Sequence, residues 1–346
     1  MLPISTRSIQ CFGRASYSLC GVLLVASSAV LALGYSEHGP ITSDPTISGR
    51  PEPKVTDGAR ANLSAKIRVQ STLVLIPVTV VDPQYHFVAG LKRDDFRLFE
   101  DQVEQNIVQC SIEDAPVSVG LIVDRSGSMR GKMDQARLAA AEFLKTANRR
   151  DEFFIVFFSD QLELASDFST ATEEIQHQLF SALADGRTAL LDAVYYASQR
   201  IRRGSATRKA LVLISDGDEN SSRYTEFEVR NLLQESDAQL FAIGLYRRVP
   251  ADTEHREALI GRTLMTRLAE VTGGFQYPVQ NLNELPQVAA TISALMRNQY
   301  ILSYRPTNQQ ADGKYRRVTV KLAQPAGRAP CRPYWRAGYY APDLLH

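Results

Sequence analysis

Short, nearly continuous apolar runs constrain the fold of this chain most strongly. They are "VSVGLIV" from Val117, "EFFIVFFS" from Glu152, "KALVLIS" from Lys209 and "QLFAIGLY" from Gln239. Runs of this kind are typical of strands that are buried on both faces of a parallel sheet. The segments between them carry apolar residues at helical spacing. The alternation predicts a doubly wound α/β domain, with helices on both faces of a mostly parallel sheet.

Side chains with oxygen donors stand where the predicted sheet ends. Asp124, Ser126 and Ser128 occupy alternate positions directly after the first run, and Asp216 directly follows the third. Thr188 lies in a turn before a helical segment. Ligands of an open α/β sheet bind beyond the carboxyl ends of its strands, so these side chains are expected to share one rim. Oxygen donors without His or Cys favour Mg²⁺, with Mn²⁺ or Ca²⁺ as alternatives.

The regions outside the α/β domain differ in composition. Arg7 and Arg14 precede an apolar run shorter than the roughly 20 residues of a membrane span, which is typical of a cleaved export signal. An uncleaved signal is the alternative, and it would be the chain's only membrane contact. The predicted parts are a signal peptide (1–34), a disordered linker (35–64), a β-strand module (65–114), the α/β domain (116–298) and C-terminal β-strands (299–342). The location expected is periplasmic or secreted.

The two β-strand segments are each too small to be stable alone. We expect them to form one small all-β sandwich, with the α/β domain inserted between them. Loss of the signal peptide removes Cys11 and Cys20 and leaves Cys110 and Cys331. Two cysteines in an exported chain are more simply interpreted as a disulfide than as a metal site, so a Cys110–Cys331 bond is predicted.

Charge and histidine placement exclude several classes of function. The formal net charge is +1, from 39 basic and 38 acidic residues, so the chain has no overall electrostatic footprint for nucleic acid or an anionic membrane. Its 5 histidines are scattered, and none has an obvious nucleophilic serine as a partner. The chain is therefore predicted not to be an enzyme, and no small-molecule cofactor is expected.

The motifs at the rim resemble a known family. "LIVDRSGSM", "GRTALLDAV" and "LVLISDGDEN" look like the three parts of the metal-ion-dependent adhesion site (MIDAS) of the von Willebrand factor type A domain, whose sheet is Rossmann-like. The resemblance implies that Asp124, Ser126, Ser128, Thr188 and Asp216 hold a Mg²⁺ directly or through water. It also implies that an Asp or Glu of a partner protein completes the coordination. The flanks, including "GLKRDDFRLFEDQVEQNI", are similar to secreted bacterial proteins called VWFA-related, which are frequent in acidobacteria.

Two other functions remain as alternatives to a metal-dependent adhesion module. The first is a structural envelope scaffold with a vestigial metal site. The second is a phosphatase of the haloacid dehalogenase type, which also places an Asp at the end of its first strand and binds Mg²⁺. That motif requires a second Asp two positions after the first, where this chain has Ser126.

Overall fold

The computed structural model describes residues 73–113, 115–181, 183–246, 256–323 and 330–343. The predicted signal peptide and linker lie outside these residues, as does the first part of the predicted β-strand module. Strands and helices alternate through the central part of the described chain, whereas the parts before and after it contain strands only, apart from a short 3₁₀ helix at Arg93–Asp95.

The central sheet has six strands in the order β10-β9-β8-β5-β6-β7. All neighbouring strands are parallel except β6 and β7. The strands are β5 (Val117–Asp124), β6 (Glu152–Phe158), β7 (Leu162–Ser169), β8 (Arg208–Ser215), β9 (Ala238–Leu245) and β10 (Gln276–Val279). The chain leaves β5 for β6 on one side and later returns to β8 on the other. The topological switch point of the sheet therefore lies beyond the carboxyl ends of β5 and β8.

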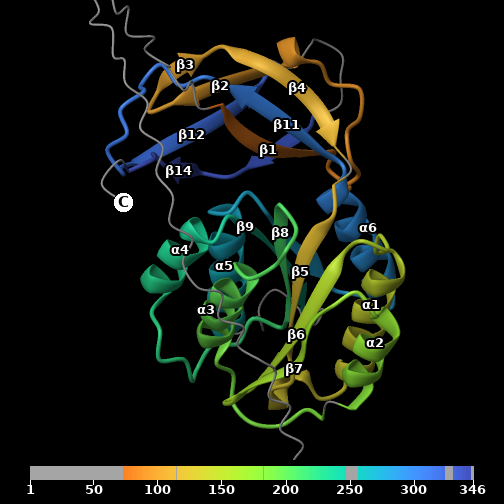
Figure 1. Ribbon diagram of the computed structural model, residues 1–346. Helices are drawn as coiled ribbons and strands as arrows, with labels where there is room; N and C mark the ends of the chain where they lie inside the picture. Colours follow the sequence, from red (N-terminus) through yellow and green to blue (C-terminus); the bar gives the residue numbers. More distant parts are fainter. Residues whose placement is uncertain (1–72, 114, 182, 247–255, 324–329, 344–346) are drawn as a thin grey trace, which may run out of the picture. The chain divides into compact units, whose positions relative to one another are not determined.

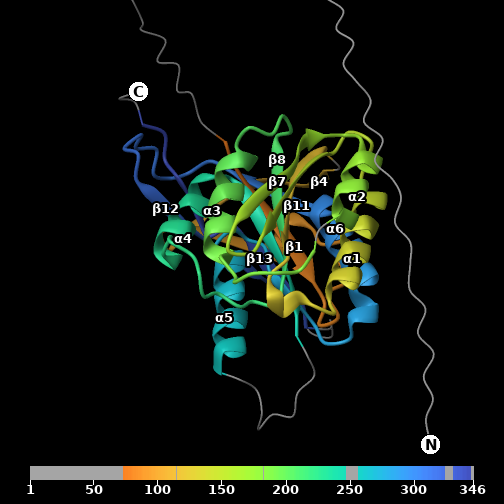
Figure 2. The same ribbon diagram turned by 90° about the horizontal axis from the view of Figure 1, so that it is seen from below.

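Helices cover both faces of this sheet (Figures 1 and 2). One face carries α1 (Met133–Lys145), α2 (Thr172–Ser181) and α6 (Leu285–Arg297), and the other carries α3 (Leu190–Ile201), α4 (Glu226–Glu235) and α5 (Arg256–Glu270). Each face encloses its own apolar core. The doubly wound, mostly parallel α/β fold is thus confirmed. Among the described helices, none is long and apolar enough to cross a membrane.

Two antiparallel sheets of four strands form a second part, the β domain. Their strand orders are β13-β1-β11-β4 and β14-β12-β2-β3, so each sheet combines strands from before and after the α/β domain. The strands are β1 (Val74–Val81), β2 (Phe96–Glu100), β3 (Val103–Gln105), β4 (Ile107–Glu113), β11 (Gln299–Tyr304), β12 (Tyr315–Leu322), β13 (Arg332–Trp335) and β14 (Gly338–Tyr340). The inner faces of both sheets contribute to one apolar core.

The last segment of the chain differs from the strand expected there. "YWRAGYY" contributes to two strands, because the chain passes from one sheet of the β domain to the other at Arg336 and Ala337. β13 pairs with β1, and β14 pairs with β12. The indole nitrogen of Trp335 donates to the Val318 carbonyl of β12 at 2.9 Å, which fixes the crossing between the sheets.

The predicted disulfide is wrong in this structure. Cys110 and Cys331 are both free thiols. Cys110 lies in β4, and Cys331 directly precedes β13, on the opposite edge of the same four-stranded sheet. Three strand spacings separate these edges, about 14 Å, whereas a disulfide requires α-carbons within about 7 Å of each other. The two chain segments belong to one sheet, as expected, but their cysteines are too far apart to form a disulfide.

The chain passes between the two domains twice, at the start of β5 and at the end of α6. Asp151, which is 1 % exposed, ties these two points together. Its Oδ1 accepts from the Val117 amide at 3.0 Å, and its Oδ2 accepts from the Arg297 guanidinium at 2.9 Å and from the Asn148 amide at 2.8 Å. Both crossings therefore lie at the amino end of the parallel strands, next to each other.

Candidate metal site at the carboxyl end of the parallel sheet

Asp124 is the last residue of β5 and is fully buried. Its Oδ1 accepts from the backbone amide of Ser126 at 2.8 Å, and its Oδ2 accepts from the hydroxyl of Ser215 at 2.6 Å. Ser215 ends β8, the strand next to β5, so this contact joins the two strands at the switch point. The carboxylate is held in one orientation by donors of the chain itself.

The two serines after Asp124 lie together, although the loop is not the extended segment that the alternating pattern suggested. Residues Gly127–Met129 form a 3₁₀ turn that starts from Ser126. The hydroxyls of Ser126 and Ser128 are 3.0 Å apart, with Ser126 buried and Ser128 exposed. A tight turn thus produces the grouping of hydroxyls that was expected from strand geometry.

Backbone hydrogen bonds join the loop of Thr188 to both other segments. The amide of Gly127 donates to the carbonyl of Gly186 at 2.9 Å. Asn220, in the loop after β8, accepts from the Thr188 amide through its side chain and donates its own amide to the Thr188 carbonyl, both at 3.0 Å. The buried Thr188 is therefore held between the loop of the serines and the loop of Asp216. The three segments come together at one rim.

Asp216 carries the least expected feature of this rim. Its Oδ2 lies 2.6 Å from the ammonium of Lys132, and both side chains are buried, with exposures of 8 % and 10 %. Its Oδ1 is also buried, yet it has no hydrogen-bond partner. A buried carboxylate oxygen without a donor costs free energy, so a cation or its bound water would satisfy an atom that the chain leaves unpaired.

Three residues of this rim were not predicted from the sequence. Ser215 and Asn220 orient Asp124 and Thr188, and Lys132 binds Asp216. The role of Ser215 could have been predicted from the sequence. Two apolar runs that pair in parallel and both end in polar residues would place Ser215 beside Asp124. The sequence gives no indication of the role of Lys132, since a lysine before an amphipathic helix is ordinarily exposed to solvent.

The donor set fits a hard divalent cation. It consists of two carboxylates and three hydroxyls on three loops that are hydrogen-bonded to one another. No group of three or more His, Cys, Asp or Glu in the described part of the chain is arranged to hold a metal, so the hydroxyls are essential to this site. Oxygen-only sites select Mg²⁺, Mn²⁺ or Ca²⁺ over softer metals.

Burial raises the pKa of Asp124 to about 7, and the neighbouring Asp216 charge adds to the rise against the hydrogen bonds from Ser126 and Ser215. The ordinary value is 3.8, so between these two pH values the folded state binds more protons than the unfolded state. The contribution of Asp124 to the stability of the metal-free protein is therefore fully present at low pH and is lost as the pH rises. Between about pH 4.5 and about pH 6.5, we expect the titration of Asp124 to lower the free energy of unfolding by about 2 to 3 kcal/mol.

Urea unfolding in the presence of a chelator measures this dependence. Asp124→Asn should remove this part of the pH dependence, whereas Asp134→Asn, in an exposed position of α1, should leave it as in the wild type. Parallel stability curves for the wild type and Asp124→Asn would show that Asp124 titrates normally.

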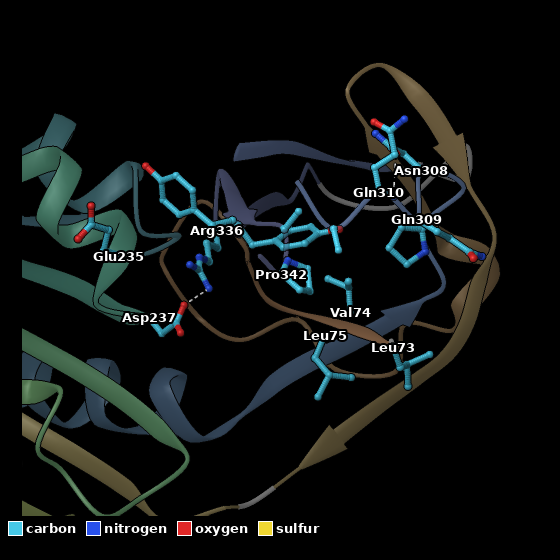
Figure 3. A pocket seen from close by; sticks show the side chains of 15 residues that line it. Leu73, Val74, Leu75, Glu235, Asp237, Asn308, Gln309, Gln310, Arg336 and Pro342 are labelled. Atoms are coloured by element: carbon cyan, nitrogen blue, oxygen red, sulfur yellow. Dashed lines mark hydrogen bonds and ion pairs between the residues drawn. The ribbon is translucent and has the colours of Figure 1, made fainter. Parts of the chain in front are cut away.

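A cavity of about 630 Å³ lies at the other end of the α/β sheet, between α4, the start of β9 and the β domain (Figure 3). Arg336 and Asp237, which lie near each other on its wall, form an ion pair. Asparagine, glutamine, proline and tyrosine side chains make up much of the rest. The cavity contains none of the candidate ligands, so it is separate from the metal site.

The fold and the candidate site define a class: a doubly wound α/β domain with oxygen donors gathered at the switch point of its sheet. Residues 119–219 match the model of the von Willebrand factor type A domain. All five predicted ligands lie within the matched residues. A search of curated proteins found no match to the chain.

Several solved structures are similar to this chain at low sequence identity. A von Willebrand factor type A protein from Catenulispora acidiphila is 13% identical, with 74% of this chain and 75% of that chain covered and a TM-score of 0.46. BatB from Bacteroides thetaiotaomicron is 15% identical, with 53% and 100% covered and a TM-score of 0.43. Proximal thread matrix protein 1 of the mussel byssus, described with a zinc-occupied MIDAS motif, is 14% identical, with 57% and 49% covered and a TM-score of 0.46.

Proposed function

We propose that the α/β domain is a metal-dependent protein-binding module. Asp124, Ser126, Ser128, Thr188 and Asp216 would hold the ion, with Mg²⁺ preferred over Mn²⁺ or Ca²⁺. The observation that carries the proposal is the buried Oδ1 of Asp216, which has no partner, at a rim where hydroxyls and carboxylates from three loops meet. When bound, the ion supplies an open coordination position for an Asp or Glu carboxylate of a partner protein.

The chain's own residues suit this role because three of the five donors are neutral. The neutral donors are the hydroxyls of Ser126, Ser128 and Thr188. The two carboxylates balance the charge of a divalent ion, and the hydroxyls add no further negative charge that would repel a partner carboxylate. Hydrogen bonds from Ser126 and Ser215 hold Asp124, and Asn220 holds the backbone of Thr188. The site is thus organised before a partner arrives.

The narrower assignment is also part of this proposal. We propose that the protein is a member of the secreted bacterial VWFA-related family, exported by residues 1–34 and joined through a linker over 35–64. The α/β domain would extend over 116–298, inserted between β-strand segments over 65–114 and 299–342. No catalytic step is assigned to the chain.

Thermal unfolding with and without metal tests the proposed function. Mg²⁺ or Mn²⁺ should stabilise the wild type by about 2.7 kcal/mol at a hundredfold excess over Kd, and EDTA should reverse the effect. Asp124→Ala should abolish the response, because it removes a buried ligand. Asp134→Ala, whose side chain is 84% exposed on α1, is the matched control and should respond as the wild type does.

Other outcomes would identify the alternatives. A melting curve indifferent to both metal and chelator would favour a scaffold with a vestigial site. Metal-dependent turnover of a generic aryl phosphate would favour a phosphatase. An Asp124→Ala variant that keeps the full metal response would show that the ligands are wrongly assigned. Pull-down from the native envelope fraction, with and without EDTA, would then identify the acidic partner.

A further inference from the structure

Lys132 belongs to the interior of the candidate site and not to its surface. The residue is 8% exposed and precedes the first turn of α1. Its amide donates to the Met129 carbonyl and its carbonyl accepts from the Ala136 amide, both at 2.9 Å, so its backbone is fixed on both sides. The side chain crosses from the loop of the serines to the loop after β8, where the ammonium meets Oδ2 of Asp216.

Arginines near this rim have partners other than the candidate ligands, and Arg187, for example, donates to the Asn220 carbonyl. Arg125 pairs with Glu163 at 2.6 Å, and Arg130 pairs with Asp185 at 2.8 Å in an exposed position. Lys132, in contrast, contacts a candidate metal ligand. It contacts only one of the two carboxylate oxygens and leaves Oδ1 of Asp216 without a partner.

We propose that Lys132 is a positioning residue of the metal site, and that its ammonium stays on Oδ2 of Asp216 when the ion is bound. Asp216 would then present Oδ1 alone to the ion or its water. A divalent ion and one ammonium against two carboxylates leave the loaded site with one positive charge. That charge favours an anionic group over a neutral one, so Lys132 makes the site select a partner carboxylate. This inference rests on the proposed function.

Two physical arguments favour an ammonium that stays. If it left Asp216, the lysine would lose its ion-pair partner while most of its side chain remained buried, which is strongly unfavourable. The ion also has no need of Oδ2, since Oδ1 is the atom that the chain leaves unsatisfied. Each oxygen of Asp216 therefore has its own cation, and neither cation displaces the other.

Manganese and acetate are suitable probes. The free Mn²⁺ signal in electron paramagnetic resonance measures ion binding, and water-proton relaxation of the bound Mn²⁺ measures displacement of its water by acetate. For Lys132→Met we expect that Mn²⁺ still saturates the protein, and that acetate binds the loaded site about tenfold more weakly, because a nearby unit charge has been removed. Lys145→Met is the matched control, since Lys145 is an exposed lysine at the far end of the same helix.

The outcomes separate the two proposals. A wild type that does not bind Mn²⁺ removes the proposed function itself. Mn²⁺ binding with equal acetate affinity in the wild type, Lys132→Met and Lys145→Met overturns only the role of Lys132. If Lys132→Met does not fold or does not bind Mn²⁺, a crystal structure of the Mn²⁺-loaded wild type decides the matter. An ammonium within hydrogen-bond distance of Oδ2 of Asp216 supports the proposal, and one turned away from it overturns the proposal.

Discussion

Replacement of Asp151 by alanine should lower the free energy of unfolding by about 3 to 5 kcal/mol. The substitution leaves the Arg297 guanidinium, which is 19% exposed, without its carboxylate and removes the acceptor of two backbone amides. Because the Val117 amide and Arg297 belong to the two crossings between the domains, the loss should affect both crossings at once. Urea denaturation measures the change directly.

A surface aspartate and a double variant give the controls for Asp151. Asp94→Ala removes a carboxylate that is 86% exposed and pairs with Arg93, which is itself 56% exposed, and it should cost less than about 1 kcal/mol. Arg297→Met combined with Asp151→Ala should be less destabilising than the sum of the single changes, because no buried charge then remains unpaired. Strict additivity would show that the ion pair does not hold the crossings together.

Gly261→Ala should destabilise the protein by about 3 kcal/mol and also remove its response to Mg²⁺. A Cβ on Gly261, in α5, would lie 1.8 Å from the carbonyl oxygen of Gly217, closer than any real contact. Gly217 follows Asp216 and has a φ of +90°, a conformation that favours glycine. The backbone after Asp216 must therefore move, and overpacking of this kind typically costs about 1 to 3 kcal/mol or more.

An exposed neighbour on the same helix provides the comparison for Gly261. Thr263→Ala changes a surface position two residues further along α5 and should leave both stability and metal response close to those of the wild type. Thermal melting with and without Mg²⁺ reports both quantities. A Gly261→Ala variant that is destabilised but retains the full Mg²⁺ shift would show that the position of the Asp216 loop is not critical.

The central strands of the parallel sheet could be predicted from the sequence because a strand that is buried on both faces has a continuous apolar sequence. β5, β6, β8 and β9 are almost entirely buried, and each appears as a short apolar run. β7 and β10 were not predicted, since both are edge strands: β7 is partly exposed and β10 contains Pro278. Edge strands need no continuous apolar run, so their sequences look like loops.

The candidate ligands could be proposed from the sequence because they follow buried strands or precede a helix. The contacts that orient them depend on tertiary structure. Lys132 and Asp216 are far apart in the chain, and nothing in either local sequence indicates that they meet. The disulfide prediction was wrong for a related reason. The sequence shows that two cysteines remain once the signal peptide is removed. The strand order places these two cysteines at opposite edges of one sheet.

The placement of the candidate site relative to the two crossings has a mechanical consequence. Asp124 and Asp216 lie at the carboxyl ends of β5 and β8, while both crossings to the β domain lie at the amino ends. A partner that pulls on the site therefore pulls along the strands. The hydrogen bonds that join β5 to β6 and β8 are then loaded in shear and must yield together, instead of opening one after another. Under the proposed function, the site would therefore bear tension between a bound partner and the β domain.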